Sequence, residues 1–141
     1  MLSLTAEHAL RALSELAALA EGQTVAGKEL ARKADIPPNY LAKILWSLGN
    51  AGFIDATRGS GGGYRLRRRA EEIRLAEVVD LFDNQRWKSR CFMSCHRECD
   101  DADACKAHEG WREVRQVYQR FLETTTIAEI AQDALRREDR V

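Results

Sequence analysis

Apolar residues recur at helical spacing in three successive stretches of the N-terminal part of the chain. One continuous apolar stripe over residues 5–20 predicts a first helix. Thr24 is expected to cap a short second helix that covers residues 24–34. The prolines of segment 35–39 cannot lie in a helix interior, so this segment predicts a tight turn, and a third helix should follow over residues 39–50.

Alternation of apolar and polar residues then predicts a β-hairpin. Residues 53–57 and 64–66 read as its two strands, and the glycine-rich segment 58–63 between them reads as its tip. Three helices followed by a hairpin is the order of a winged helix-turn-helix. A short strand over residues 73–75 and a helix that ends at Phe82 are expected to complete this domain.

The pattern changes after the winged helix, and the predicted chain has three parts: a DNA-binding domain (1–83), a cysteine-rich loop (84–108) and a helical end (109–141). Apolar periodicity is lost in the loop, and loops of this length are usually functional or disordered. The helical end begins with a long helix. Its apolar seam consists of Trp111, Val114, Tyr118, Phe121 and Leu122. Thr126 and Glu129 form a capping box for a last helix, so the predicted fold is mainly α with a small β-hairpin wing.

The third helix and the hairpin carry the side chains expected to contact DNA. The second helix of a helix-turn-helix enters the major groove by its N-terminal residues. Asn39 can pair with an adenine edge or simply cap its helix, and Lys43 can reach guanine or a phosphate. The predicted contacts with DNA are Lys28, Asn39, Tyr40, Lys43, Arg58, Gly59, Ser60 and Arg65.

The hairpin has two further interpretations. Its tip is flanked by five arginines, Arg58, Arg65, Arg67, Arg68 and Arg69, and its glycines would let backbone amides approach phosphate. A nucleotide-binding loop is disfavoured, because no Gly-Lys-Ser/Thr and no long helix follow. A plain hairpin with a solvated arginine edge remains the alternative.

Charge is divided unevenly along the chain, although the net charge is zero. Residues 1–69 carry ten basic and six acidic side chains, a balance of +4, and the remainder has a balance of −4. This division favours nucleic-acid binding by the first part only. No segment resembles a membrane span or a signal peptide, so we expect a cytoplasmic protein whose clustered thiols bind metal rather than form disulfides.

Four cysteines and two histidines crowd into the loop and its junction with the long helix. The cysteines are Cys91, Cys95, Cys99 and Cys105, and the histidines are His96 and His108. Structural zinc sites usually have two well-separated Cys-x2–4-Cys pairs. Closely strung single cysteines favour an iron–sulfur cluster instead, with zinc or thiol–disulfide sensing as alternatives.

Three motifs resemble those of one bacterial family. Residues 36–41 (IPPNYL) begin the recognition helix, residues 48–54 (LGNAGFI) end it, and residues 58–66 (RGSGGGYRL) form the wing. With these motifs the chain resembles the Rrf-two family of winged-helix regulators, which contains IscR-, NsrR- and RirA-like iron–sulfur regulators. The resemblance covers nearly the full length and implies a homodimer joined through the long helix. Ala42 departs from the glutamate of IscR-like members, so the operator sequence does not transfer.

The resemblance also implies a set of cluster ligands. The preferred ligands of a 2Fe-2S cluster are Cys91, Cys99, Cys105 and His108, and the alternates are Cys95 and Glu7. Glu7 matches a ligating aspartate that NsrR-like members supply across the dimer to a 4Fe-4S cluster. Cys105 and His108 are three residues apart, so one helical turn would bring both to the same face.

The sequence therefore predicts a DNA-binding transcription regulator, expected to be a repressor, which is controlled by an iron–sulfur cluster. The cluster would sense iron or cluster status, nitric oxide or redox stress. One alternative is a winged-helix regulator controlled by zinc or by a thiol–disulfide switch, and another is an electron-transfer or cluster-carrier protein. No spacing suggests a nucleophile–base pair, so an enzyme is not expected.

Overall fold

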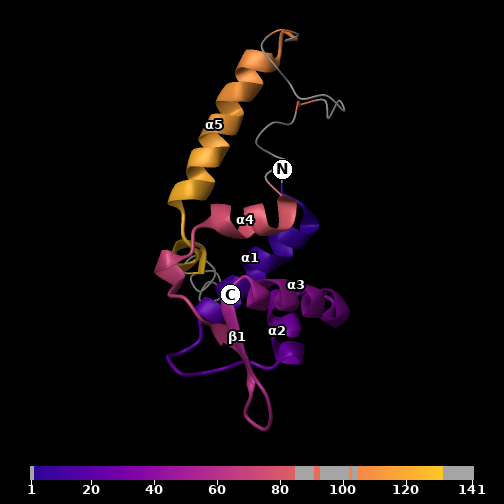
Figure 1. The fold of residues 1–141 in the computed structure, drawn as a ribbon, viewed down its shortest axis with the longest axis vertical. Coiled ribbons are helices and arrows are strands. Elements are labelled where there is room, and N and C mark those ends of the chain that lie inside the picture. Colours follow the sequence, from indigo (N-terminus) through magenta and orange to yellow (C-terminus); the bar gives the residue numbers. More distant parts are fainter. Residues whose placement is uncertain (1, 85–90, 93–101, 103–104, 132–141) are drawn as a thin grey trace, which may run out of the picture.

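The computed structural model describes residues 2–84, 91–92, 102 and 105–131. Its elements follow the predicted order, and a long helix projects from one end while the hairpin tip projects from the other (Figure 1). The elements are α1 (Leu4–Ala17), α2 (Gly27–Ala34), α3 (Pro38–Asn50), β1 (Ile54–Thr57), β2 (Gly63–Leu66), a 3-10 turn η1 (Ala70–Glu72), α4 (Leu75–Asp83) and α5 (His108–Thr124). Residues 127–131 are also helical. The mainly α fold with a small hairpin is confirmed.

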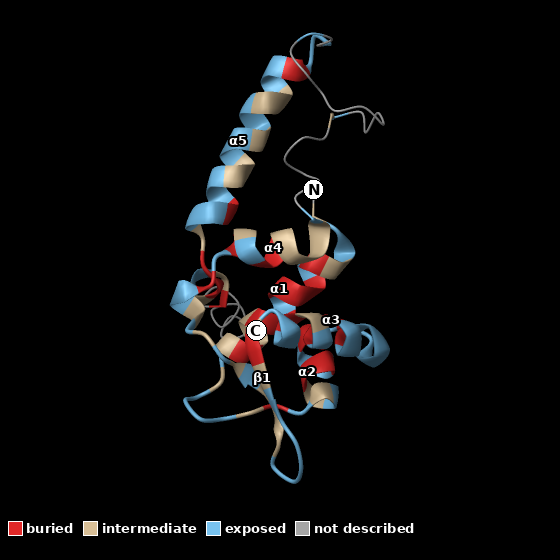
Figure 2. Cartoon of the chain, viewed as in Figure 1, coloured by how far each residue is buried: buried red, intermediate tan, exposed pale blue. Residues whose placement is uncertain are grey.

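Helix α1 is the element around which the winged helix assembles. It contacts α2, α3, α4 and β2, and its ribbon is largely red in Figure 2. Its buried stripe alternates small and large apolar side chains, namely Ala6, Ala9, Leu10, Ala12, Leu13 and Leu16. The alanines let neighbouring helices approach closely, and the leucines fill the space between them.

The start of α1 is tied to the end of α4. Ser3 caps α1 by accepting a hydrogen bond from the amide of Ala6 at 3.1 Å. Ser3 also bonds the carboxylate of Asp83, through its amide at 3.2 Å and through its hydroxyl. Two elements that are distant in sequence are thereby held together at the side from which α5 projects.

The wing is completed by the segment before α2, which sequence reasoning assigned to a helix cap. Strands β1 and β2 are antiparallel, and Val25 adds an isolated bridge to Tyr64 with hydrogen bonds of 3.1 and 2.8 Å. The predicted cap at Thr24 is wrong: Ala26 is the N-cap of α2, and the Thr24 hydroxyl donates to the Gly61 carbonyl at 3.1 Å. The long-range pairing holds residues 24–25 extended, so the helix begins later.

Two wing glycines are required by close backbone contacts. A Cβ atom on Gly63 would lie 2.3 Å from the carbonyl oxygen of Val25, and one on Gly62 would lie 2.3 Å from that of Thr57. Both distances are far below van der Waals contact. Glycine at these positions therefore lets β2 approach the segment before α2 and lets the hairpin close.

The C-terminal end of α5 is attached to the winged helix by backbone hydrogen bonds. The predicted strand over residues 73–75 is wrong, because only Arg74 is bridged, and its partner is Thr126 rather than a wing strand. The amide of Ile127 donates to the carbonyl of Ile73 at 2.9 Å, and Leu122 is buried beside this junction. None of the helices in the described part of the chain combines the length and the apolar character that a bilayer crossing requires.

The predicted capping box is confirmed just beyond α5. The amide of Thr126 donates to the Glu129 carboxylate at 2.6 Å, and the amide of Glu129 donates to the Thr126 hydroxyl at 3.4 Å. Residues 127–131 follow as a helix, and the predicted remainder of it lies outside the described residues.

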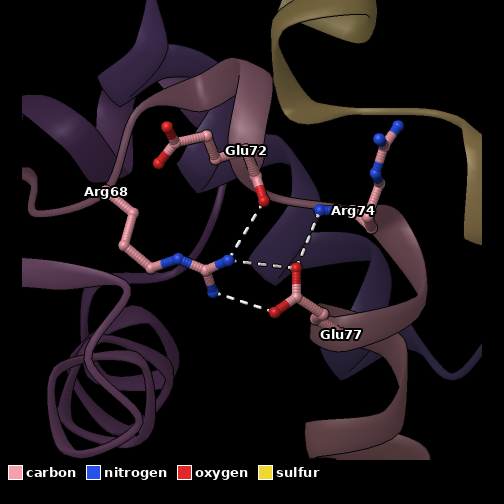
Figure 3. Close-up of polar contacts among 4 residues, drawn as sticks. All are labelled: Arg68, Glu72, Arg74 and Glu77. Carbon is pink, nitrogen blue, oxygen red and sulfur yellow. Dashed lines mark hydrogen bonds and ion pairs between the residues drawn. The ribbon is translucent and has the colours of Figure 1, made fainter.

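The carboxylate of Glu77, near the start of α4, accepts hydrogen bonds from the side chain of Arg68 and from the backbone amide of Arg74, on either side of η1 (Figure 3). The Arg68 guanidinium donates to Glu77 at 2.9 and 3.3 Å and to the Glu72 carbonyl at 3.0 Å. The amide of Arg74 donates to the same Glu77 carboxylate at 3.0 Å. Arg68 also lies 5.3 Å from the centroid of the Phe53 ring. Arg68 therefore joins the wing to α4 and is not a free arginine of the hairpin edge.

We expect the Glu77 carboxylate to make stability depend on pH. Burial disfavours its charged form, but the hydrogen bonds from Arg68 and from the Arg74 amide, with the charges of both arginines, outweigh burial and lower the pKa of Glu77 below its usual value. Its stabilisation is therefore full above the ordinary carboxyl pKa and is lost as pH falls through the lowered one. Because Arg68 and Glu77 are 35% and 41% exposed, Glu77→Gln should cost under about 1 kcal/mol at neutral pH.

Thermal unfolding measured from about pH 7 down to about pH 3 checks this expectation. The gap in melting temperature between the parent chain and Glu77→Gln should close as the pH falls. Glu71→Gln is the matched control, because Glu71 forms only a 3.7 Å pair with Arg69 between side chains that are 64% and 75% exposed. A gap of the same size at every pH would contradict the assigned role.

Candidate functional site

The exposed face of α3 is the first part of the candidate nucleic-acid interface. Asn39, Ala42, Lys43, Trp46, Gly49 and Asn50 are all exposed. Leu41, Ile44, Leu45 and Leu48 are buried on the opposite side. Pro37 is the N-cap and makes no side-chain capping bond, so the interpretation of Asn39 as a helix cap is wrong. The side chain of Asn39 instead lies in the first turn, exposed on the same face as Lys43.

Tyr40 differs from the other predicted DNA contacts, because α1 holds it. Its hydroxyl lies 2.9 Å from the Thr5 hydroxyl, and its ring packs edge-on against His8 with centroids 5.5 Å apart. His8 is buried, and its Nδ1 lies 2.6 Å from a guanidinium nitrogen of Arg11. Because a guanidinium only donates, this Nδ1 is the acceptor. Tyr40, 41% exposed, therefore fixes the first turn of α3 against α1.

The five arginines around the wing fall into two groups. Arg67 lies 3.9 Å from Asp55, Arg69 lies 3.7 Å from Glu71, and Arg68 is held by Glu77. Arg58 and Arg65 are exposed, and neither side chain makes a hydrogen bond or ion pair within the part of the chain that the structure describes. Asp55 faces Arg65 across the hairpin register, so its charge partly offsets that of Arg65, whereas Arg58 at the tip has no acidic residue opposite it.

The remaining predicted contacts lie on exposed backbone and on α2. Gly59 and Ser60 are exposed at the hairpin tip, and Gly59 has φ +96°, a conformation that favours glycine. Lys28 is exposed in the first turn of α2. Lys28 lies on α2, Lys43 lies on α3, and the predicted wing contacts lie on the hairpin. The hairpin and α2 lie at the end of the molecule opposite α5 (Figure 1).

Two described parts of the cysteine segment, residues 91–92 and 105–108, lie at the N-terminal part of α5. Cys91 is half-buried and Cys105 is exposed. Phe92 packs edge-on against Trp111 of α5, with ring centroids 5.4 Å apart. The amide of His108 donates to the Cys105 carbonyl at 3.0 Å, which forms one turn at the start of α5. Phe92, next to Cys91, and the turn that contains Cys105 are therefore both placed against the first turns of α5.

The predicted ligands are only partly described. His108 is buried in the first turn of α5, and Glu7 is exposed in the first turn of α1. Cys95, Cys99 and His96 lie outside the described residues. Within the ranges that the structure does describe, no three His, Cys, Asp or Glu side chains form a group that could hold a metal ion.

The apolar seam predicted on α5 is divided between two faces. Leu122 is buried, and Trp111 and Tyr118 are half-buried against the rest of the chain. Val114, Val117 and Phe121 are exposed by 48%, 64% and 51% on a neighbouring face, which we call the α5 outer face. Sequence reasoning missed Val117, although its spacing from Val114 and Phe121, of three and four residues, is helical.

Solved structures of transcription regulators share this fold. CymR of B. subtilis, described as a global cysteine regulator, superposes with a TM-score of 0.78 at 22% identity, covering 94% of this chain and 96% of that one. IscR of T. potens superposes with a TM-score of 0.72 at 21% identity, covering 95% of this chain and 88% of that one. These likenesses confirm the winged-helix architecture with its long C-terminal helix.

Sequence relatives agree. The HTH-type transcriptional regulator NsrR of Geobacillus kaustophilus is 32% identical over 127 residues, which are 90% of this chain and 86% of that protein. Protein rrf2 of Nitratidesulfovibrio vulgaris is 29% identical over 140 residues, 94% of this chain and 88% of that protein. The family model Rrf2, described as an iron-dependent transcriptional regulator, matches residues 2–133. The chain belongs to the Rrf2 family of DNA-binding transcriptional regulators.

Proposed function

We propose that this chain is a cytoplasmic homodimeric repressor without enzymatic activity, whose binding to promoter DNA is controlled by an iron–sulfur cluster in segment 84–108. One observation carries the proposal: a winged helix with exposed cations and a thiol-rich segment occur in the same short chain. The first feature supplies affinity for duplex DNA, and the second supplies a group that can change with iron supply, nitric oxide or redox state.

The pairing of charges supports DNA binding by α3 and the wing tip. Three wing arginines already have carboxylate partners, whereas Lys43 and Arg58 are exposed on the recognition helix and the tip. Cations of this kind gain most from phosphate, because each contact releases a condensed counterion. Asn39 on the same face can pair with adenine through its amide. The proposed interface thus combines contacts that add affinity with contacts that read sequence.

Replacing Lys43 or Arg58 with Ala should weaken DNA binding. A lost phosphate contact lowers affinity for all sequences and reduces the salt slope by about one, whereas a lost base contact costs about 1–3 kcal/mol at one position. Arg69→Ala is the control for loss of a positive charge, because Arg69 is the N-cap of η1, after the end of β2 and away from the hairpin tip. Fluorescence anisotropy with promoter fragments at several salt concentrations measures both effects. If Lys43→Ala and Arg58→Ala both bind like the parent chain, α3 and the wing are not the interface.

The α5 outer face supports the homodimer. Val114, Val117 and Phe121 expose apolar surface along one side of a helix that projects from the body (Figure 2). A second copy of the same helix, packed about a two-fold axis, would cover this surface with an identical one. Two winged helices joined in this way would present their recognition helices about 34 Å apart, as a pseudo-palindromic site requires.

Val117→Glu should produce a monomer, because the charge would be buried at the proposed helix contact. Loss of the second half-site should lower affinity for a pseudo-palindrome at least about tenfold. Gln116→Glu is the matched control, since it adds the same charge at an exposed position on another face of α5. Sedimentation equilibrium and DNA titration measure the two effects. A dimeric Val117→Glu chain would reject this face as the interface.

The donor set supports a cluster at the N-terminal end of α5. Cys91, Cys99 and Cys105 supply thiolates, and His108 supplies an imidazole from the first turn of the helix. Thiolates and imidazole are established ligands of iron–sulfur clusters. When bound, a 2Fe-2S cluster would supply a centre that reacts with oxidants and nitric oxide. The Phe92–Trp111 contact supports this location, since it places the neighbour of Cys91 against the helix that carries His108.

Single substitutions should identify the ligands. His108→Ala should alter the absorption spectrum of anaerobically purified protein, whereas Cys95→Ala and Glu7→Ala should leave it nearly unchanged. Circular dichroism of each variant controls for misfolding, because His108 is buried. Iron and sulfide counts distinguish 2Fe-2S from 4Fe-4S. Loss of the cluster in Cys95→Ala with a silent His108→Ala would reject the ligand set, and zinc or reversible disulfides without iron would favour the zinc- or thiol-controlled regulator.

A further inference from the structure

Within the part of the chain that the structure describes, no contact of Trp46 explains its presence on α3. It is 71% exposed, the largest fraction among the large hydrophobic side chains in the described part of the chain. The other large apolar side chains on this helix beyond its first turn, such as Ile44 and Leu45, are buried by the core. An exposed indole gains no burial energy in the free protein, so the core does not account for Trp46.

Its position on the helix is central to the DNA-facing side. At 3.6 residues per turn, Trp46 lies between the edge formed by Ala42 and Gly49 and the edge formed by Lys43 and Asn50. All four of these neighbours are exposed. Because Ala42 and Gly49 have little or no side chain, the indole extends beyond them and is the large group that projects most directly from this face.

We propose that Trp46 is a specificity-determining residue that packs its indole against the C5-methyl group of a thymine in the major groove. This assignment rests on the proposed function and names a feature of the operator. Among the base edges of the major groove, the thymine methyl is the apolar group, and apolar side chains recognise it by contact. Lys43 is exposed beside Trp46, and α3 carries no acidic residue, so the flanks of the indole suit a polyanion.

The geometry of the helix locates this thymine relative to the other contacts. Trp46 lies about 10 Å along the helix axis from Asn39 at 1.5 Å per residue. The major groove winds around the duplex, so successive base pairs are at least 3.4 Å apart along it, and this distance spans at most about three base pairs. Each half-site should therefore contain a thymine within about three base pairs of the position read by the first turn of α3.

Removal of single methyl groups from the operator tests the assignment. A promoter fragment bound by the parent chain, tested both with and without its cluster, is prepared with each thymidine replaced in turn by deoxyuridine, which deletes only the C5-methyl. One replacement per half-site should weaken the parent chain about fourfold. Trp46→Ala should lower affinity for the intact site about tenfold and abolish the response to that deoxyuridine, while Trp46→Phe should keep part of both.

The controls separate this assignment from its alternatives. Trp46→Ala should melt like the parent chain, since the indole is exposed, and Ser47→Ala on the flank of α3 should bind DNA like the parent chain. If Trp46→Ala weakens every sequence equally and no deoxyuridine has an effect, the indole contacts the sugar–phosphate backbone and the assignment is overturned. If it binds like the parent chain, the assignment of Trp46 alone fails. If the parent chain binds no DNA, the proposed function fails with it.

Discussion

The burial of α1 is the constraint on which the remaining arrangement depends. Its alanines admit α2, α3 and α4 at close range, and its leucines fill the space between them. The same helix orients the recognition helix, since Thr5 and His8 both contact Tyr40. A change in the position of α1 would therefore move α3 as well. The DNA-facing side chains are placed by a packed core and not by the loop that precedes them.

Helix α5 is attached to the winged helix at its C-terminal end and projects away from it toward its N-terminal end (Figure 1). The C-terminal end of α5 is bonded to the winged helix through Ile73 and Ile127, and the other end carries His108 beside the cysteine segment. In the proposed dimer, the α5 outer face would lie between the two winged helices. A small change in the packing of the two α5 helices would change the distance between the two recognition helices. Binding to two half-sites requires a fixed distance, so the affinity for DNA would fall. Control by a group at the N-terminal end of α5 would then need no contact with α3.

The sequence predicted helices and strands well where local patterns decide them, and it failed where distant contacts decide. The turn before α3 and the capping box at Thr126 depend on neighbouring residues, and both were predictable. Thr24 was misassigned because Val25 pairs with Tyr64, far along the chain. The apolar seam of α5 was read as one surface, because periodicity cannot tell which part packs on its own chain. The whole predicted ligand set stays a prediction, and two of its members, Cys99 and the alternate Cys95, lie outside the described residues.

At the wing, too, contacts in the folded chain decide which charged side chains are paired. Five arginines surround the hairpin in sequence, yet Asp55, Glu71 and Glu77 each neutralise one of them. Exposed ion pairs contribute little to stability, so the pairs of Arg67 and Arg69 add little to folding. Arg68 is different, because Glu77 and the Phe53 ring hold it in place. Among the described residues, the cations of the wing and of α3 that have no ion pair are Arg58 at the tip, Arg65 on β2 and Lys43 beside Trp46. The arginine count alone does not show this difference, because it depends on which acids the fold places beside each arginine.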